Sequence, residues 1–188
     1  MASHGPLFSR MVRAALLQPA LYEEVEADRD ATGQALLAVV LVSAATGIGT
    51  GLEALMLGGI DRFLHGLVYG VAGAITGWLL WALFAYILGV SILKGPQTSS
   101  TWGELLRTMG FASTPGILRT FVFVPVAGNL IALAGSIWRL LATIIAVRQA
   151  LDFSTWRGII VTLVGWVLYM VLLSLMRLLA SGVTPTLL

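Results

Sequence analysis

The charged residues of this chain that could do chemistry lie inside long apolar runs. Arg139 is in the middle of one run, Arg119 lies in another, and Glu53 is the one carboxylate within any of them. A charged side chain at the centre of a membrane costs about 2.5–3.5 kcal/mol even after relaxation, so it needs a partner. These three residues are therefore the first candidates for a site that contacts a protein partner or a lipid.

Arg139 makes the strongest demand, because its side chain can only partly reach the expected membrane surface. Outside the chain, its partner could be an anionic lipid, a charged helix of another subunit, or an ion or proton pathway. Arg119 is expected to reach the phosphates of the cytoplasmic leaflet. Within the chain, the candidate partners of Arg139 are Glu53, Asn129, Thr143 and the carbonyls freed by Pro125.

No set of residues in the sequence predicts an enzyme. Cysteine is absent, Ser99 and Ser100 have no neighbouring base, and no two carboxylates are placed to converge. His65 could ligate a haem or chlorophyll axially, although a hydrogen bond at the membrane edge explains it more simply. His4 is expected on the opposite side of the membrane, so the two histidines do not form a metal site. We therefore predict no catalytic residue, metal or cofactor.

Five apolar runs dominate the sequence, in which 58% of residues are hydrophobic, 11% are charged and the mean hydropathy is +0.93. Runs of this kind are typical of membrane-spanning helices, and they lack the alternation of a membrane β-barrel. The third run is short and contains Pro115, which predicts a kink, a tilt or local thinning of the bilayer. The sequence predicts an all-α, polytopic membrane protein with spans at Gln34–Leu57, Leu64–Leu93, Ala112–Val124, Leu130–Val147 and Gly158–Leu179.

The basic residues between the runs indicate the orientation. If the N-terminus is cytoplasmic, seven of them face the cytoplasm (Arg10, Arg13, Arg29, Lys94, Arg107, Arg148 and Arg157) and two face outward (Arg62 and Arg177). This bias predicts a cytoplasmic N-terminus and an external C-terminus. The basic residues stand singly at membrane boundaries, without a basic stripe or stacking aromatic residues, so no nucleic-acid partner is expected.

Two shorter segments have the pattern of amphipathic helices that lie on the membrane surface. The first precedes Pro19 and has an apolar stripe at helical spacing, formed by Phe8, Met11, Val12, Ala15 and Leu16. The second begins at a capping box from Thr101 to Glu104, and Trp102 is expected at the headgroup level. A docking surface for a soluble partner is the alternative for the second segment. Residues 1–33 thus form a cytoplasmic amphipathic and acidic segment, and residues 34–188 form the membrane domain.

Small residues recur at helical spacing in the second run. Gly66 and Gly70 are four residues apart, and Gly77 belongs to a parallel row. Such rows let helix backbones approach closely. Packing within the chain is the simpler interpretation, and self-association or docking onto another membrane subunit is the alternative.

Taken together, these motifs resemble the Yip (Ypt-interacting protein) domain. The resemblance rests on Gln18-Pro19 after a short amphipathic helix, on the run Trp102 to Arg107, on the run Gly110 to Pro115, and on the later pairs Val124-Pro125 and Ile137-Trp138. It implies a five-span membrane domain with a cytoplasmic N-terminus, and in eukaryotic relatives it implies binding to Rab-type GTPases. About 33 residues precede the first run here, without the long cytosolic arm of those relatives. The resemblance thus points to a prokaryotic member in the cytoplasmic membrane.

The predicted function is a non-enzymatic membrane scaffold that binds lipids or other membrane proteins. Its candidate contact residues are Arg139, Glu53, Arg119, Trp102, Pro115, Gly66, Gly70 and Gly77. One alternative is an accessory or assembly subunit of a larger bioenergetic or transport complex. Another is a small transporter or channel, which an internal inverted repeat would favour, and the sequence shows none.

Overall fold

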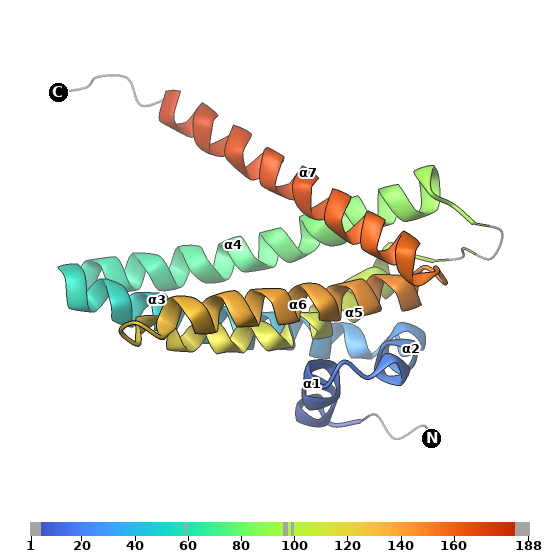
Figure 1. Ribbon diagram of the computed structural model, residues 1–188, viewed down its shortest axis with the longest axis horizontal. Helices are drawn as coiled ribbons and strands as arrows, with labels where there is room; N and C mark the ends of the chain where they lie inside the picture. Colours follow the sequence, from blue (N-terminus) through green and yellow to red (C-terminus); the bar gives the residue numbers. More distant parts are fainter. Residues whose placement is uncertain (1–4, 59, 96–97, 99, 183–188) are drawn as a thin grey trace.

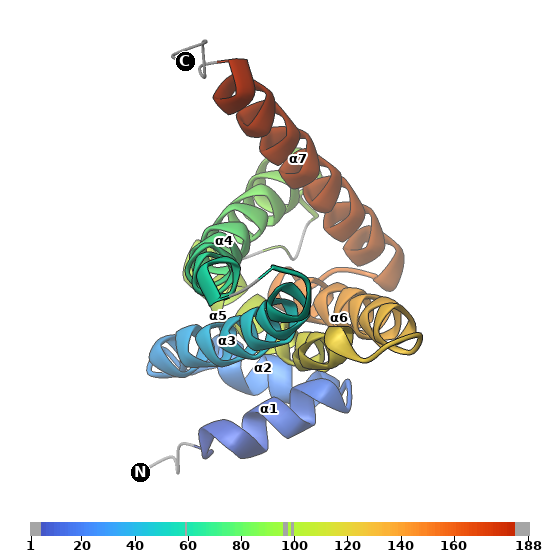
Figure 2. The same ribbon diagram turned by 90° about the vertical axis from the view of Figure 1, so that its left-hand side faces the viewer.

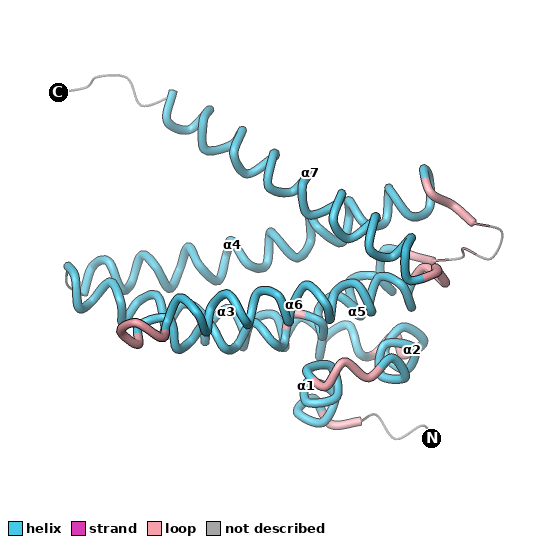
Figure 3. Tube along the Cα trace, viewed as in Figure 1, coloured by secondary structure: helices cyan, strands magenta, loops and turns pink. Residues whose placement is uncertain are grey.

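The computed structural model describes residues 5–58, 60–95, 98 and 100–182, and these form helices and connecting loops without a strand (Figures 1 and 3). Four helices are long and apolar enough to cross a membrane. They are α3 (Ala31–Gly58), α4 (Ile60–Ile87, continued by the π-helical η1, Leu88–Ile92), α6 (Gly128–Ala150) and α7 (Thr155–Gly182). The all-helical membrane fold predicted from the sequence is confirmed at this level.

The third predicted span has a different form from the other four. It comprises the end of α5 (Trp102–Ala112) and a 3₁₀-helix, η2 (Thr114–Phe123), rather than one α-helix. Pro115 stands at the start of η2, where its missing N–H removes a bond that a continuous α-helix would need. Both segments pack against α3 and α6. The described residues therefore contain four helices that meet the requirements for a span, and the fifth crossing is not established.

Helix α5 begins at the predicted capping box, but it is more buried than a helix on the membrane surface would be. Thr101 and Glu104 make both bonds of the capping box. Leu105, Thr108 and Phe111 are completely buried, so the apolar stripe and the polar side both contact protein. The prediction that this segment lies on the membrane surface is therefore not supported, because α3, α4 and α6 cover it.

The N-terminal segment folds into α1 (Leu7–Ala15) and α2 (Pro19–Ala27), which lie below the long helices in the view of Figure 2 and pack against α5, η2 and α6. The turn between them places Leu17 in the left-handed region, with φ at 58°. Helix α1 lies across the direction of the long helices and is seen end-on in Figure 1. Its residues Phe8, Val12 and Leu16 are 77%, 41% and 62% exposed, so an apolar stripe faces away from the protein.

Glycines bring the long helices close together. A Cβ at Gly49 in α3 would lie 2.5 Å from the carbonyl oxygens of Arg119 and Thr120 in η2. A Cβ at Gly47 would lie 2.9 Å from Leu67 in α4. Gly47 and Gly49 of α3 therefore serve packing within this chain.

Candidate functional site

A cavity of about 460 Å³ lies between α4, η2, α6 and α7, and two arginines supply its charge. Arg139 comes from α6 and Arg119 from η2. Three aromatic side chains also line it: Trp81 from α4, and Trp166 and Tyr169 from α7. None of the residues that line it is a carboxylate. The cavity is therefore cationic, with apolar and aromatic walls.

The guanidinium of Arg139 has a ring contact but lacks an anionic partner among the described residues. Its Cζ lies 5.8 Å from the centroid of the Trp81 ring, a cation–π distance. Its Nε is buried and makes no hydrogen bond. The Trp81 indole is itself fixed, because its Nε1 donates to the Thr162 carbonyl at 3.3 Å. The ring contact thus orients Arg139 without neutralising its charge.

Thr143 and Glu53, two of the partners predicted within the chain, make no described hydrogen bond or ion pair with the Arg139 side chain. Thr143 bonds the Arg139 backbone, donating its hydroxyl to that carbonyl at 2.8 Å. Glu53 is exposed on α3, and none of the described ion pairs joins it to Arg139. Sequence reasoning identified Arg139 as a residue in need of a partner, and the structure leaves that need unmet within the described chain.

Arg119 is exposed and lines the same cavity as Arg139, together with a second, smaller cavity of about 100 Å³. Arg119 lies four residues before Phe123, the last residue of η2. It is therefore far from Trp102, which begins the preceding helix α5. Two guanidinium groups that line one cavity repel each other, and a shared anion would relieve that repulsion. The arrangement can bind an anionic group.

Small residues leave room for the cavity. A Cβ at Gly77 in α4 would lie 2.6 Å from the Tyr169 hydroxyl, so this glycine lets α7 approach α4. Gly116 in η2 lies beside Arg139, with its ideal Cβ 3.7 Å from Arg139 Cδ. Gly77 therefore packs inside the chain.

The sequence also agrees with a known family. The model of the Yip1 domain matches residues 13–176, which is most of the chain. The chain belongs to the Yip1 domain family. The predicted resemblance is thus confirmed. No curated protein and no solved structure matches the chain.

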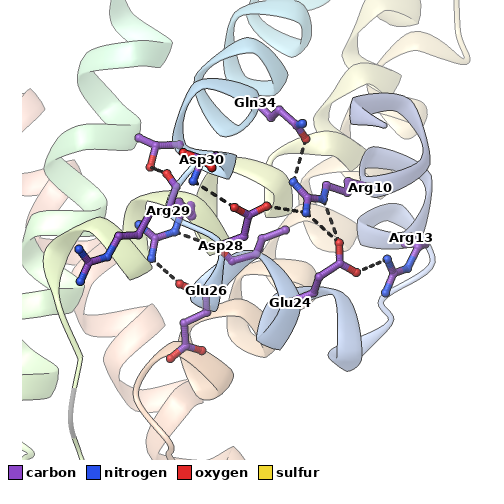
Figure 4. Close-up of polar contacts among 11 residues, drawn as sticks. Arg10, Arg13, Glu24, Glu26, Asp28, Arg29, Asp30 and Gln34 are labelled. Carbon is purple, nitrogen blue, oxygen red and sulfur yellow. Dashed lines mark hydrogen bonds and ion pairs between the residues drawn. The ribbon is translucent and has the colours of Figure 1, made fainter. Parts of the chain in front are cut away.

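In this Yip1 domain, a group of ion pairs fixes α1 beside the bundle (Figure 4). Arg10 is 2% exposed and donates to Glu24 at 3.0 Å, to Asp28 at 2.7 Å and to Gln34 at 3.1 Å. Arg13 donates to the other Glu24 oxygen at 2.5 Å. We call Arg10, Arg13, Glu24, Asp28 and Gln34 the N-terminal cluster. It joins α1 to α2 and to the start of α3.

The N-terminal cluster was not predicted as a unit. Glu24 and Asp28 belong to the acidic part of residues 1–33, and they bond basic residues of α1. Burial raises the pKa of Glu24, but the hydrogen bonds from Arg13 and Arg10 outweigh it, so this pKa lies below its ordinary value. The opposite charges of the two segments were a signal that could have predicted the pairing.

The contact between α1 and α6 sets the level of Arg139. Trp138, the residue before Arg139, donates its indole N–H to the Ala15 carbonyl at the end of α1 at 2.8 Å. Arg139 therefore lies at the same level of the fold as the C-terminal end of α1.

A second recess, about 510 Å³ in volume, lies between α2, α5 and the loop after α6. Three of its carboxylates are Glu26, Glu104 and Asp152. Burial, followed by the charges of Glu104 and Asp152, raises the pKa of Glu26 to about 7.

The remaining predicted residues lie apart from the arginine cavity. Trp102 is 41% exposed at the start of α5, and Pro115 is buried at the start of η2. The Nδ1 of His65 lies 2.7 Å from the Asp61 carbonyl, one turn earlier in α4. Gly66 and Gly70 also belong to α4, but their surroundings lie outside the described residues. Within the described part of the chain, no group of three or more His, Asp or Glu could hold a metal ion.

Proposed function

We propose that this Yip1-domain protein is a non-enzymatic membrane scaffold that binds an anionic group of a partner in the bilayer. The observation that carries the proposal is the buried Nε of Arg139, which has no hydrogen-bond partner among the described residues. Leaving a buried charged donor unsatisfied costs more than an ordinary hydrogen bond provides. A partner that brings an anion into the cavity would remove this cost.

The proposal includes five crossings with a cytoplasmic N-terminus. Helix α5 and η2 together form the third crossing. In this topology, four basic residues lie at the cytoplasmic end of the bundle. They are Arg10 on α1, Lys94 after η1, Arg107 on α5 and Arg148 near the end of α6. This distribution follows the positive-inside rule.

The test is the purification of the full chain in mild detergent, followed by native mass spectrometry of what remains bound. Arg139→Gln removes the charge from the cavity. Arg157→Gln is the matched control, because Arg157 also lies over an aromatic ring, 5.5 Å from the centroid of Phe153, but outside the cavity.

We expect Arg139→Gln to reduce the bound species about tenfold or more, since breaking a desolvated charge pair costs roughly 2 kcal/mol or more. Arg157→Gln should retain it. Equal retention in both variants would contradict the proposal. Loss of ion flux from vesicles containing Arg139→Gln, without loss of any bound species, would instead favour a transporter.

A further inference from the structure

We infer that the occupant of the arginine cavity is an anionic phospholipid, whose phosphate lies between Arg119 and Arg139 and whose acyl chain follows α7. This inference rests on the proposed function and names the partner.

The chemistry of the cavity suits a phosphate. Arg119 and Arg139 supply guanidinium donors from two different elements, and the lining residues include no carboxylate. The planar fork of a guanidinium matches the spacing of phosphate oxygens, and a phosphodiester offers acceptors for both groups. Ser136 and Tyr169 add hydroxyl groups to the wall.

The depth of the cavity suits a headgroup. Trp138 ties the level of Arg139 to α1 through its 2.8 Å bond to Ala15. Helix α1 presents Phe8, Val12 and Leu16 outward, as a helix at the headgroup boundary does. A phosphate near Arg139 would therefore lie within reach of the leaflet that holds α1.

An apolar groove continues from the cavity. It has a volume of about 410 Å³ and runs along α7 from Trp166 to Leu178, with Ser174 as its one polar lining residue. Trp166 and Met170 line both the groove and the arginine cavity. Helix α7 diverges from α4 toward its C-terminal end (Figures 1 and 2). The divergence leaves this face of α7 open beside the cavity.

The shape favours a lipid over a helix of another protein. A helix packed on α7 at an interaxial distance of about 8–10 Å would cover this face, but would not by itself place an anion beside Arg139. The groove is lined by α7 alone, and the cavity volume is that of a small-molecule site. A phosphate with an acyl chain matches the charged cavity followed by a shallow, open apolar groove along α7.

The experiment titrates the purified, delipidated full chain with phosphatidylglycerol and with phosphatidylcholine of the same acyl chains, using native mass spectrometry and the melting temperature. We expect phosphatidylglycerol to bind at least tenfold more tightly and to raise the melting temperature. Arg139→Gln and Arg119→Gln should each reduce this preference about tenfold, while Arg157→Gln should keep it. Because Arg119 is exposed, its variant tests the site even if Arg139→Gln fails to fold.

A second arm compares dihexanoyl with dioleoyl phosphatidylglycerol, and both with inorganic phosphate. Weaker binding of the short-chain lipid supports the α7 groove, and equal binding of all three anions overturns the lipid assignment. Equal binding of the two headgroups also overturns it. A protein or peptide retained through Arg139 would overturn the lipid assignment while leaving the proposed function intact. If Arg139→Gln changes the binding of no lipid, protein or peptide, the result contradicts both the lipid assignment and the proposed function.

Discussion

At the scale of single residues, Glu26 combines partial burial with three neighbouring carboxylates (Glu104, Asp152 and Glu23), and its pKa is raised to about 7. A group whose pKa is higher in the folded state favours folding most at low pH. Its contribution is fully present below the ordinary carboxyl pKa and is lost as the pH rises through about 7. Glu26 therefore makes the end of the bundle at α2 less stable at alkaline pH.

Glu26→Gln should remove this dependence, because the amide stays neutral at every pH. We expect the variant to be more stable than the wild type at pH 8.5 by about 1 kcal/mol after solvent screening, or roughly 2–4 °C in melting temperature. At pH 4.5 the two proteins should melt together. Glu53→Gln, on the distant half of α3, is the control for losing a carboxylate. A difference that is the same at both pH values would show that the charge of Glu26 is not responsible.

At the residue level, the sequence carries a signal where a single amino acid differs from its surroundings. Arg139 could be identified from its charge within apolar sequence. Trp81 and Tyr169 could not, because an aromatic residue in a membrane helix has the same sequence appearance whether it faces lipid, a neighbouring helix or an arginine. The rotation of α4, α6 and α7 about their axes decides which residues line the same cavity. The sequence does not reveal this rotation, because lipid and the protein interior are both apolar and the apolar periodicity is therefore weak.

At the scale of elements, the contact between α3 and η2 positions Arg119 in the cavity. Gly49→Ala would place a methyl group 2.5 Å from two backbone carbonyl oxygens of η2, and backbone cannot yield as a flexible side chain does. We expect a loss of about 1–3 kcal/mol, the usual cost of overpacking. Gly33→Ala is matched to it in the same helix, with nothing within 4 Å of the new Cβ. That variant should gain up to about 1 kcal/mol from helix propensity.

Thermal unfolding in detergent measures both glycine variants. If Gly49→Ala is as stable as Gly33→Ala, α3 and η2 do not pack as closely as described.

The elements themselves were predictable to different degrees. The capping box fixed the start of α5, since Thr101 and Glu104 make local bonds that need no tertiary context. The environment of α5 was not predictable, because an apolar stripe that faces lipid and one that faces α3 have the same spacing. Helix α1 shows the converse case. Its stripe was predicted, but Arg10 is buried by partners on α2 and α3 that local sequence does not reveal.

At the scale of the whole molecule, the topology depends on whether α5 and η2 together cross the membrane. If they do, Ser100 before α5 and Asn129 at the start of α6 lie on opposite sides, and Ser154 after α6 shares the side of Ser100. If they do not, Ser100 and Asn129 lie on the same side. The chain has no native cysteine, so each position can be tested by a single Ser→Cys or Asn→Cys substitution and a membrane-impermeant thiol reagent.

The positive-inside distribution and the five-crossing topology together give one expected pattern in intact cells. Asn129→Cys should react with the reagent, and Ser100→Cys and Ser154→Cys should be protected until the membrane is permeabilised. Reaction after permeabilisation is the control that each thiol is accessible on its own side. Matching reactivity of Ser100→Cys and Asn129→Cys would instead leave α5 and η2 as a re-entrant segment. That result would also contradict the fold, in which α3 and α7 run in the same direction (Figure 1) and Trp138, next to Arg139, bonds the Ala15 carbonyl of α1. The labelling pattern therefore tests the topology on which the entry of an anionic partner from the leaflet of α1 depends.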